Sequence, residues 1–428
     1  MIPQTHREIT NYINSLYKLN LIDHTTKNYL LPKTPPRTPL FYTLPKIHKD
    51  GIPGRPIISG CDSPTDKLSS FVDYFLKPLI PTIPSYIKDT TDFLQKILTL
   101  PPLPKNAKLV TIDVKSLYTN IPQDEGIQTV LDMLDSHPDT NRPNNNILKR
   151  MMTYILKYNY FQFNNDNYLQ IHGTAMGTKF APSFANIFMA HIEDLIQQNA
   201  PDNLLPYLWL RFLDDIFLIW LHDDDSLQKF LDYINTIHPT IKFTYTISET
   251  SADFLDTTIY KLSNGQLAST LYRKPTDTIQ LLHYQSNHPI STKVGVIYSQ
   301  ALRLRRIITE DINFEKQLQL LQRILMKRKY PLELIYRTFN KARQFSQHQL
   351  LFQTRNSNTR QPILPFVIEY NPTLPNINNI LQQNWNIITN DPTLNEIFPN
   401  TPTIAYKRHK NLKDRLIHTK FSTNTQQR

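Results

Sequence analysis

Cysteine is nearly absent from this sequence, since the 428 residues contain only Cys61. A single cysteine excludes an internal disulfide and any cysteine-rich zinc module, and it suits a chain that works in a reducing compartment. Any metal ion would then have to be held by oxygen ligands. We expect an intracellular protein, located in the nucleus or, as the alternative, in the cytoplasm.

Long apolar runs are also missing. No stretch approaches the roughly 20 residues that a membrane-spanning helix requires, and the N-terminus lacks the basic flank and apolar stretch of a secretory signal. We therefore expect a soluble protein without a membrane partner. Glycine is scarce, with 8 residues against 32 prolines, so each glycine is expected where the backbone turns or approaches another group closely.

The charge balance is basic. Lys and Arg outnumber Asp and Glu by 47 to 36, which gives a net charge of +11. Such a balance is typical of a protein that binds a polyanion, with nucleic acid as the first candidate, although a basic protein without such a partner is the alternative on charge alone. The length and the hydrophobic content of 40% allow two or three domains or one large multi-lobed enzyme.

Two acidic residues, Asp214 and Asp215, stand in the segment 209–220, which reads WLRFLDDIFLIW and is otherwise apolar, with Arg211 as its only other charge. Its flanks can be buried as two strands only if the acids fall at the tight turn between them. A second apolar strand, KLVTIDV at residues 108–114, has Asp113 as its last polar position. If these strands are neighbours, three carboxylates converge and can hold two Mg²⁺ ions, or Mn²⁺ in their place, for phosphoryl transfer. A surface turn is the alternative for the Asp pair taken alone.

A basic finger is predicted at residues 41–60, which read FYTLPKIHKDGIPGRPIISG and fit a strand, a turn and a second strand. The cations of this segment are Lys46, His48, Lys49 and Arg55. A short hairpin that carries them can hold a triphosphate, because arginine matches phosphate oxygens bidentately. A solvated basic hairpin is the alternative.

Hydrophobic periodicity predicts the other elements before residue 290. Helices are expected at residues 1–31 (one or two short ones), 64–100 (broken at prolines), 124–134, 147–158, after the glycine loop HGTAMGT, and 226–237. Further strands are expected at residues 160–171 (a hairpin), 241–247, 254–262 and 267–272. Together they predict an α+β fold in which helices cover one face of a sheet.

The C-terminal part has a different character. Residues 291–350 are predicted to be mostly helical and are rich in cations, among them Arg303, Arg305 and Arg306. A basic helical lobe of this kind suggests a clamp on a nucleic-acid backbone. Residues 351–428 are rich in Asn and Pro, and we expect weaker order there.

In this order the motifs resemble the reverse transcriptases of Penelope-like retroelements, which are relatives of telomerase. The resemblance runs from about residue 40 to about residue 310 and rests on FYTLPKIHK, PGRPIIS, LVTIDVKSLYTNIP, HGTAMGTKFAPSFANIFM, RFLDDIFLIW, FLDTTIYK and YRKPTD. It implies a right-hand polymerase fold with fingers, palm and a helical thumb. It also implies RNA-directed DNA synthesis, with an RNA template, a DNA primer and deoxynucleoside triphosphates as partners.

The resemblance implies domain boundaries as well. They are 1–40 for an N-terminal helical lead-in, 41–107 for the fingers, 108–262 for the palm with a fingers insertion at about 124–170, 263–350 for a primer-grip hairpin and basic helical thumb, and 351–428 for the Asn/Pro-rich C-terminal region. The chain shows no GIY or YIG motif and no cysteine after Cys61, so we expect no GIY-YIG endonuclease. The abrupt start of the chain suggests a fragment of a longer element. The oligomeric state stays open.

Roles for single residues follow from the same resemblance. Asp113 and Asp214 would be the metal ligands, with Asp215 as a supporting acidic ligand. The lysine that acts as general acid on pyrophosphate in many polymerases has no clear counterpart, and Lys242 is only a guess. A catalytically inactive nucleic-acid-binding protein derived from a retroelement is the competing hypothesis.

The remaining implied roles concern substrate binding. Arg55, with Lys46 nearby, would contact the incoming triphosphate, and Tyr118 would exclude a ribose 2′-hydroxyl. Gly177 would lie in the loop under the template-paired base. The primer grip would span residues 254–260, with contacts from Phe254, Leu255 and Asp256, and the nucleic-acid backbone would contact Arg303, Arg305 and Arg306.

Overall fold

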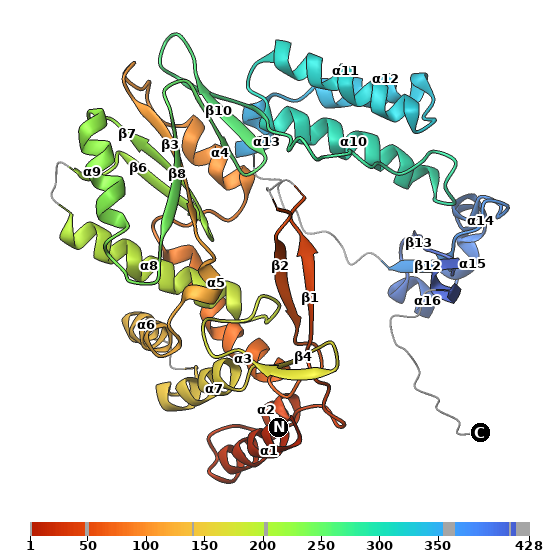
Figure 1. Ribbon diagram of the computed structural model, residues 1–428. Coiled ribbons are helices and arrows are strands. Elements are labelled where there is room, and N and C mark those ends of the chain that lie inside the picture. The colour runs from red at the N-terminus through yellow and green to blue at the C-terminus, as the bar shows by residue number, and fades with distance from the viewer. Residues whose placement is uncertain are drawn as a thin grey trace. The chain divides into compact units, whose positions relative to one another are not determined.

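The computed structural model describes residues 2–47, 51–138, 141–200, 204–353, 364–410 and 412–416. The chain divides into two compact units, Met1–Asp277 and Thr278–Arg428, whose elements are drawn in Figure 1. The division falls inside the predicted segment 263–350, between its hairpin and its helices. Within the described ranges, no helix combines the length and the apolar character that crossing a membrane requires.

A four-stranded antiparallel sheet lies at the centre of the first unit, and we call it the palm sheet. Its strands follow the order β6-β7-β3-β8. They are β3 (Lys108–Val114), β6 (Leu208–Phe212), β7 (Asp215–Trp220) and β8 (Phe243–Ser248). β3 pairs with β7 on one side and with β8 on the other, so the predicted neighbourhood of β3 and the hairpin is confirmed.

Both faces of the palm sheet are covered, which corrects the prediction of helices on one face only. Val110 and Ile112 alternate onto the face that packs into the main core with the helices. On the opposite face, the Phe217 ring packs against Phe93 of α4 and Phe254 of β9, with centroids 5.2 and 5.6 Å apart. The near-continuous burial of β3 is typical of a strand enclosed on both sides.

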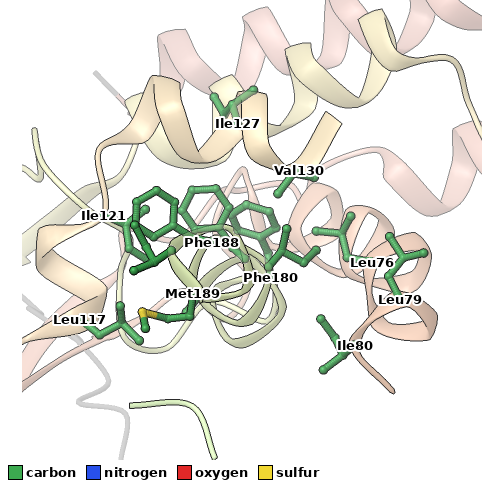
Figure 2. Packing of buried hydrophobic residues seen from close by; sticks show 14 of the residues in the cluster. Leu76, Leu79, Ile80, Leu117, Ile121, Ile127, Val130, Phe180, Phe188 and Met189 are labelled. Atoms are coloured by element: carbon green, nitrogen blue, oxygen red, sulfur yellow. The ribbon is translucent and has the colours of Figure 1, made fainter. Parts of the chain in front are cut away.

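Helix α8 organises the main core of this unit. Figure 2 shows Phe188 and Met189 of α8 among apolar side chains of other helices, with Ile127 and Val130 of α6 on one side. The helices of the unit are α1 (Ile2–Lys18), α2 (His24–Leu30), α3 (Asp66–Leu76), the 3₁₀ helix η1 (Lys77–Thr82), α4 (Thr90–Leu98), α5 (Leu117–Asn120), α6 (Gln123–Ser136), α7 (Asn145–Lys157), α8 (Ala181–Asn199) and α9 (Asp224–Ile234). These positions confirm the predicted helices.

A second four-stranded sheet forms the fingers, with strand order β2-β1-β4-β5. Its strands are β1 (Leu40–Pro45), β2 (Gly54–Ser59), β4 (Tyr160–Phe163) and β5 (Asp166–Leu169). The predicted insertion therefore supplies two strands to the fingers sheet, through a parallel contact in which the Gln162 amide donates to the Pro39 carbonyl at 2.8 Å. His48 and Lys49 lie outside the described residues.

A three-stranded sheet follows the palm, with order β11-β10-β9. Its strands are β9 (Ser251–Phe254), β10 (Thr257–Lys261) and β11 (Leu267–Leu271). The prediction of one strand at residues 254–262 is wrong, because the chain reverses at Leu255, which has the left-handed φ of +55°. The turn lacks the Gly or Asn that usually marks such a conformation, so no residue at this position indicates the reversal.

The second unit begins with a helical bundle, which confirms the predicted helices at 291–350. Its helices are α10 (Ile290–Ile307), α11 (Asp311–Lys327), α12 (Leu332–Arg343) and α13 (Gln347–Phe352). Apolar residues at helical spacing, such as Ile297, Ala301 and Leu304 on α10, are buried against the other helices of the bundle.

The region predicted to be weakly ordered contains regular elements in its described part. β12 (Pro365–Glu369) and β13 (Thr403–Lys407) form a parallel pair, and α14 (Ile377–Asn384), α15 (Asn386–Thr389), α16 (Pro392–Ile397) and α17 (Leu412–Leu416) are helices. Asn376 and Asp391 cap α14 and α16 by accepting from backbone amides, so residue types that suggested disorder here start helices. Residues 354–363 and 417–428 lie outside the described residues.

Candidate active site

The three predicted acids lie together at one end of the palm sheet. The register of β3 and β7 places Asp113 directly opposite Asp215, so both side chains lie on the same face. Asp214 occupies the turn between β6 and β7, and its carbonyl oxygen accepts a hydrogen bond of 2.9 Å from the Val114 amide at the end of β3. This bond fixes the turn to the strand that carries Asp113.

The pKa values of two of these acids, Asp214 and Asp215, are raised. Burial raises the pKa of the Asp214 carboxyl above its ordinary value, and the charge of Asp113 raises it further. Asp215 is exposed, yet the protein around it removes enough water to raise the pKa of its carboxyl to about 6, with added contributions from Asp214 and Asp113. A group of carboxylates in this state favours the binding of a cation.

A buried ion pair supports the turn. The Arg211 side chain on β6 is 0% exposed, and its Nε lies 2.7 Å from Oε1 of Glu193 on α8. The same guanidinium donates to the Asn186 side chain at 2.9 Å and reaches the carbonyl of Leu213 at 3.4 Å. Because Leu213 takes the left-handed φ of +55° just before Asp214, Arg211 positions the backbone that presents the acid.

Cations of the fingers act on the same acids. The pairing of β1 and β2 places Arg55 near the end of the hairpin, and Lys46 follows β1 directly, with its amide 2.9 Å from the Pro53 carbonyl. The positive charges of Arg55 and Lys46 both lower the pKa of the Asp214 carboxyl, against the larger effect of burial. Both predicted triphosphate ligands are therefore close enough to Asp214 to interact with it electrostatically.

Tyr118 borders this group of charges. Burial raises the pKa of its hydroxyl to about 12, with a further increase from Asp214 and an opposing effect from Arg55. Its carbonyl accepts a hydrogen bond of 2.7 Å from the Thr174 amide. Gly173, next to Thr174, has a φ of +66°, and a Cβ there would lie 2.3 Å from the Tyr118 carbonyl oxygen, so only glycine permits this contact.

Gly177 belongs to the same loop and contacts the fingers. Its φ is +129°, and a Cβ there would lie 2.2 Å from the carbonyl oxygen of Ile58 on β2. One residue earlier, the Met176 carbonyl accepts a hydrogen bond of 2.8 Å from the Ile58 amide. Gly177 thus allows the loop to pack directly on the strand that carries Arg55.

The oxygen ligands of the acid group suit a hard divalent cation such as Mg²⁺ or Mn²⁺. Within the described ranges, no three His, Cys, Asp or Glu side chains form a group that could hold a metal ion by themselves. Mg²⁺ usually binds through one or two carboxylates and the phosphate oxygens of its substrate, so a complete cage is not required. An ion at these acids would therefore need further ligands from a bound substrate.

The predicted primer-grip residues have packing roles in the structure. Phe254 is buried, with its ring 4.7 Å from the Phe93 ring. The Asp256 carboxylate accepts a hydrogen bond from the Thr90 hydroxyl at the start of α4. Leu255 lies at the turn between β9 and β10. This hairpin is therefore anchored to α4 through Phe254 and Asp256.

The lysine that interacts with the acids is Lys274, not Lys242 as guessed from the sequence. The Lys242 ammonium donates to the carbonyls of Asn235 and His238, at 2.7 and 3.1 Å, after the end of α9. The positive charge of Lys274, from the YRKPTD motif, lowers the pKa of Asp215. Lys274 is therefore near enough to Asp215 to interact with it electrostatically, although only its motif was noted in the sequence.

The three arginines predicted to contact a nucleic-acid backbone lie on α10 in the second unit. Arg305 has a structural role, because its guanidinium donates to the Phe345 carbonyl and to Asp311, both at 2.7 Å. Arg303 is exposed and Arg306 is half-buried. Other exposed cations of the bundle are Lys316, Arg323, Lys327, Lys329, Arg337, Lys341 and Arg343, the last of which pairs with Glu315.

Comparisons with protein families match two parts of the chain. Residues 47–244 match the family described as reverse transcriptase (RNA-dependent DNA polymerase). Residues 280–340, from before α10 into α12, match the animal helix-turn-helix domain. No curated protein matches the chain. The first match spans 198 of the 428 residues, slightly less than half of the chain.

Several solved structures are similar to this chain. The telomerase of Candida albicans, in complex with a fragment of telomeric RNA, is 11% identical with a TM-score of 0.51, and the match covers 84% of this chain and 65% of that one. The fold is a right-hand polymerase fold. The C-terminally truncated telomerase of Candida tropicalis (13% identity, TM-score 0.43, 56% of each chain) and the RNA-dependent RNA polymerase of a human picobirnavirus (11%, 0.45, 67% of this chain and 55% of that one) are also similar. This chain spans less than two thirds of the length of each of these three proteins.

In the polymerase fold, sequence reasoning missed the residues that hold the acids in place. Arg211 was recognised only as a charge in an apolar segment, and Glu193 was not singled out. An arginine in an apolar strand, three residues before the Asp pair, could have indicated an acidic partner on a neighbouring element.

Proposed function

We propose that this chain is an RNA-directed DNA polymerase that adds deoxynucleotides to a primer 3′-hydroxyl, of the type found in Penelope-like retroelements. One observation carries the proposal. Asp113 lies opposite Asp215, Asp214 occupies the adjoining turn, and the fingers cations Arg55 and Lys46 act on the Asp214 carboxyl. Acids on the palm facing cations on the fingers can bind a nucleoside triphosphate between them.

Each group has a separate task in this proposal. Asp113 and Asp214 would hold two Mg²⁺ ions, with Asp215 in support, and the bound ions would lower the pKa of the primer hydroxyl and neutralise charge on the phosphates. Arg55 and Lys46 would bind the triphosphate. The Tyr118 hydroxyl is protonated at neutral pH, as in any tyrosine with an ordinary or raised pKa, so Tyr118 would present an uncharged wall to the sugar.

The choice of an RNA template and of DNA as the product rests on similarity. The reverse transcriptase match supports it, as does the order of motifs shared with Penelope-like elements. The similar telomerase from Candida albicans is a complex with RNA, which agrees with an RNA partner for the fold. The animal helix-turn-helix match at residues 280–340 supports a nucleic-acid contact by the second unit.

Primer extension tests the proposal. The purified chain should extend a DNA primer on an RNA template in the presence of Mg²⁺ and deoxynucleotides, and Asp214→Asn should reduce the rate roughly 10²- to 10³-fold, the effect typical of removing one electrostatic element of an active site. Asp224→Asn is a matched control, because Asp224 pairs with Lys108 at the far end of the same sheet. Equal extension by the wild type and Asp214→Asn would sink the proposal.

The sugar selectivity provides a second test. If Tyr118 excludes the 2′-hydroxyl, Tyr118→Ala should incorporate ribonucleotides at a higher rate relative to deoxynucleotides, while Tyr118→Phe should keep the wild-type preference. The Phe variant separates the bulk of the ring from its hydroxyl. An unchanged preference in Tyr118→Ala would remove this role from Tyr118.

A nucleic-acid-binding protein without catalytic activity is the second candidate, and the basic helices of the second unit favour it. Their exposed cations would contact phosphates, and such binding weakens as salt rises. In this case, binding to a primer–template duplex would be salt-sensitive and would survive Asp113→Ala, and no nucleotide would be incorporated at any metal concentration. Incorporation that depends on Asp113 decides against it.

A further inference from the structure

We infer that the fingers contain a pocket for one unpaired nucleobase of the template strand, on the face of β2 opposite Arg55. The inference rests on the proposed function, because it names a binding site for the strand that the polymerase would copy. It concerns residues that the resemblance to reverse transcriptases did not assign.

A cavity of about 370 Å³ lies between the fingers sheet and the segment that leads to the glycine loop. Its volume is within the range of sites that bind small organic groups. The walls are largely apolar, with Phe41 and Ile58 from β1 and β2, Phe161 and Tyr168 from β4 and β5, and Met176 from the loop. All of these elements belong to the first unit.

The aromatic rings of this pocket lie side by side on the neighbouring strands β1, β4 and β5. The Phe161 ring lies 5.5 Å from the Phe41 ring and 5.6 Å from the Tyr168 ring, with an interplanar angle of 18° to the latter. Tyr168 remains 45% exposed. An accessible flat ring beside an apolar cavity is the feature on which single-stranded nucleic acids stack their bases.

Polar groups in the wall favour a base over a purely apolar ligand. Thr174 is 1% exposed, and its hydroxyl has no hydrogen-bond partner among the described residues. Thr119 and Gln170 also line the cavity. A nucleobase has apolar faces and hydrogen-bonding edges, so its chemistry matches aromatic walls that alternate with hydroxyl and amide groups.

The alternation along β2 places the pocket across the strand from the nucleotide side. Arg55, which acts on Asp214, points to one face, and Pro56 and Ile58 belong to the other. The Ile58 amide bonds to Met176 at 2.8 Å, next to Gly177. A template base against the Gly177 loop would thus have its unpaired neighbour within reach of the pocket.

The pocket is also joined to the predicted sugar gate. Thr174 donates its amide to the Tyr118 carbonyl at 2.7 Å, and Thr119 is the next residue in the chain. A base that binds between Thr119 and Thr174 would therefore contact the backbone segment that positions Tyr118.

Binding measurements without nucleotides test the pocket independently of catalysis. A labelled DNA primer is annealed to RNA templates with a single-stranded 5′ overhang, and an abasic site is moved along the overhang one position at a time. We expect one position to weaken binding roughly 5- to 150-fold, the range for loss of one stacked base, and the others to change it about twofold or less. In Tyr168→Ala this position dependence should disappear.

Two further variants keep the result interpretable. Tyr74→Ala removes an aromatic side chain on α3 that is 72% exposed and lies outside the pocket, and it should retain the wild-type profile. Thr174→Val keeps the shape and removes the unpartnered hydroxyl. It should preserve or raise the melting temperature of the free chain while it reduces discrimination between bases at the sensitive position.

The outcomes separate this inference from the proposed function. A flat profile in the wild type, or the same profile in Tyr168→Ala as in the wild type, contradicts the pocket even if primers are extended. A position-dependent profile that Tyr168→Ala abolishes supports the pocket even if no primer is extended, and then the polymerase proposal alone fails.

Discussion

The two ends of β3 differ in whether their charged side chains are paired with opposite charges. At its first residue, the Lys108 ammonium lies 2.7 Å from Asp224 and 2.6 Å from Glu249. At the other end, Asp113 faces Asp215 across the pair of strands, with Asp214 beside them. One end of β3 thus pairs a cation with two carboxylates, and the other end lies in a group of three acids.

The pKa values show how these states differ. Hydrogen bonds to Asp224 and then to Glu249 raise the pKa of Lys108, so its charged form is stabilised. Burial and neighbouring negative charge raise the pKa values of Asp214 and Asp215, so their charged forms are destabilised. Paired charges maintain the fold, whereas the repulsion among the acids is relieved by protonation or by a bound cation.

The largest effect on stability is expected from a charge that is both buried and paired. Arg211→Met would leave Glu193 of α8 without its cation, and breaking a buried ion pair in this way typically costs about 3–5 kcal/mol. Unfolding by urea should show this loss. The double variant Arg211→Met/Glu193→Gln should recover part of it, because the stranded charge is gone, whereas equal losses in the two variants would contradict the pairing.

The next largest effect concerns activity at the acid end. Asp113→Asn should reduce primer extension roughly 10²- to 10³-fold. Because it also removes one of the repelling charges, it should not destabilise the metal-free chain. Loss of activity together with a lower urea midpoint would instead indicate that Asp113 has a structural role like that of Lys108.

Neutralising the basic end should have the opposite consequences. Lys108→Met removes a partner from both Asp224 and Glu249, so the urea midpoint should fall, although less than in Arg211→Met because both carboxylates are largely exposed. The loss should shrink as salt rises, and primer extension should stay within about twofold of the wild type. A strong loss of extension in this variant would mean that the two ends of β3 are coupled.

Some features of the acid end of β3 and of its surroundings were predictable from the sequence. The pairing of β3 with the Asp-Asp hairpin was predictable, because apolar strands with single acids at their ends have few arrangements that bury the apolar residues. The fingers hairpin was predictable from its Gly and Pro turn signals. The reversal at Leu255 was not, because an apolar residue occupies the left-handed position and the strand pattern continues through it.

The support of the site was not predictable for a different reason. Arg211 and Glu193 lie on separate elements, and Lys274 acts on Asp215 from beyond β11, so these contacts depend on tertiary packing. Local patterns in one sequence contain no information on such pairings. The C-terminal helices were missed because Asn and Asp, which are common in disordered chains, serve there as helix caps.

The smallest effect expected is a stabilisation at the acid end. The pKa of Asp215 in the folded chain is about 6, above its value in the unfolded chain, so the folded state binds more protons between about pH 4 and pH 6 and loses stability as the pH rises through that window. At pH 7 the full penalty is present in the metal-free protein. Asp215→Asn should therefore raise its melting temperature by about 1–3 °C at pH 7, and the gain should vanish near pH 4.

A matched variant at the other end of β3 should respond with the opposite sign. Asp224→Asn removes a partner of Lys108, so it should lower the melting temperature at pH 7 or leave it unchanged. Saturating Mg²⁺ with a nucleotide should favour the wild type over Asp215→Asn, because the bound cations stabilise the ionised acid. If Asp215→Asn lowers the melting temperature of the metal-free protein at pH 7, the acids are not mutually repelling and the contrast between the two ends of β3 is wrong.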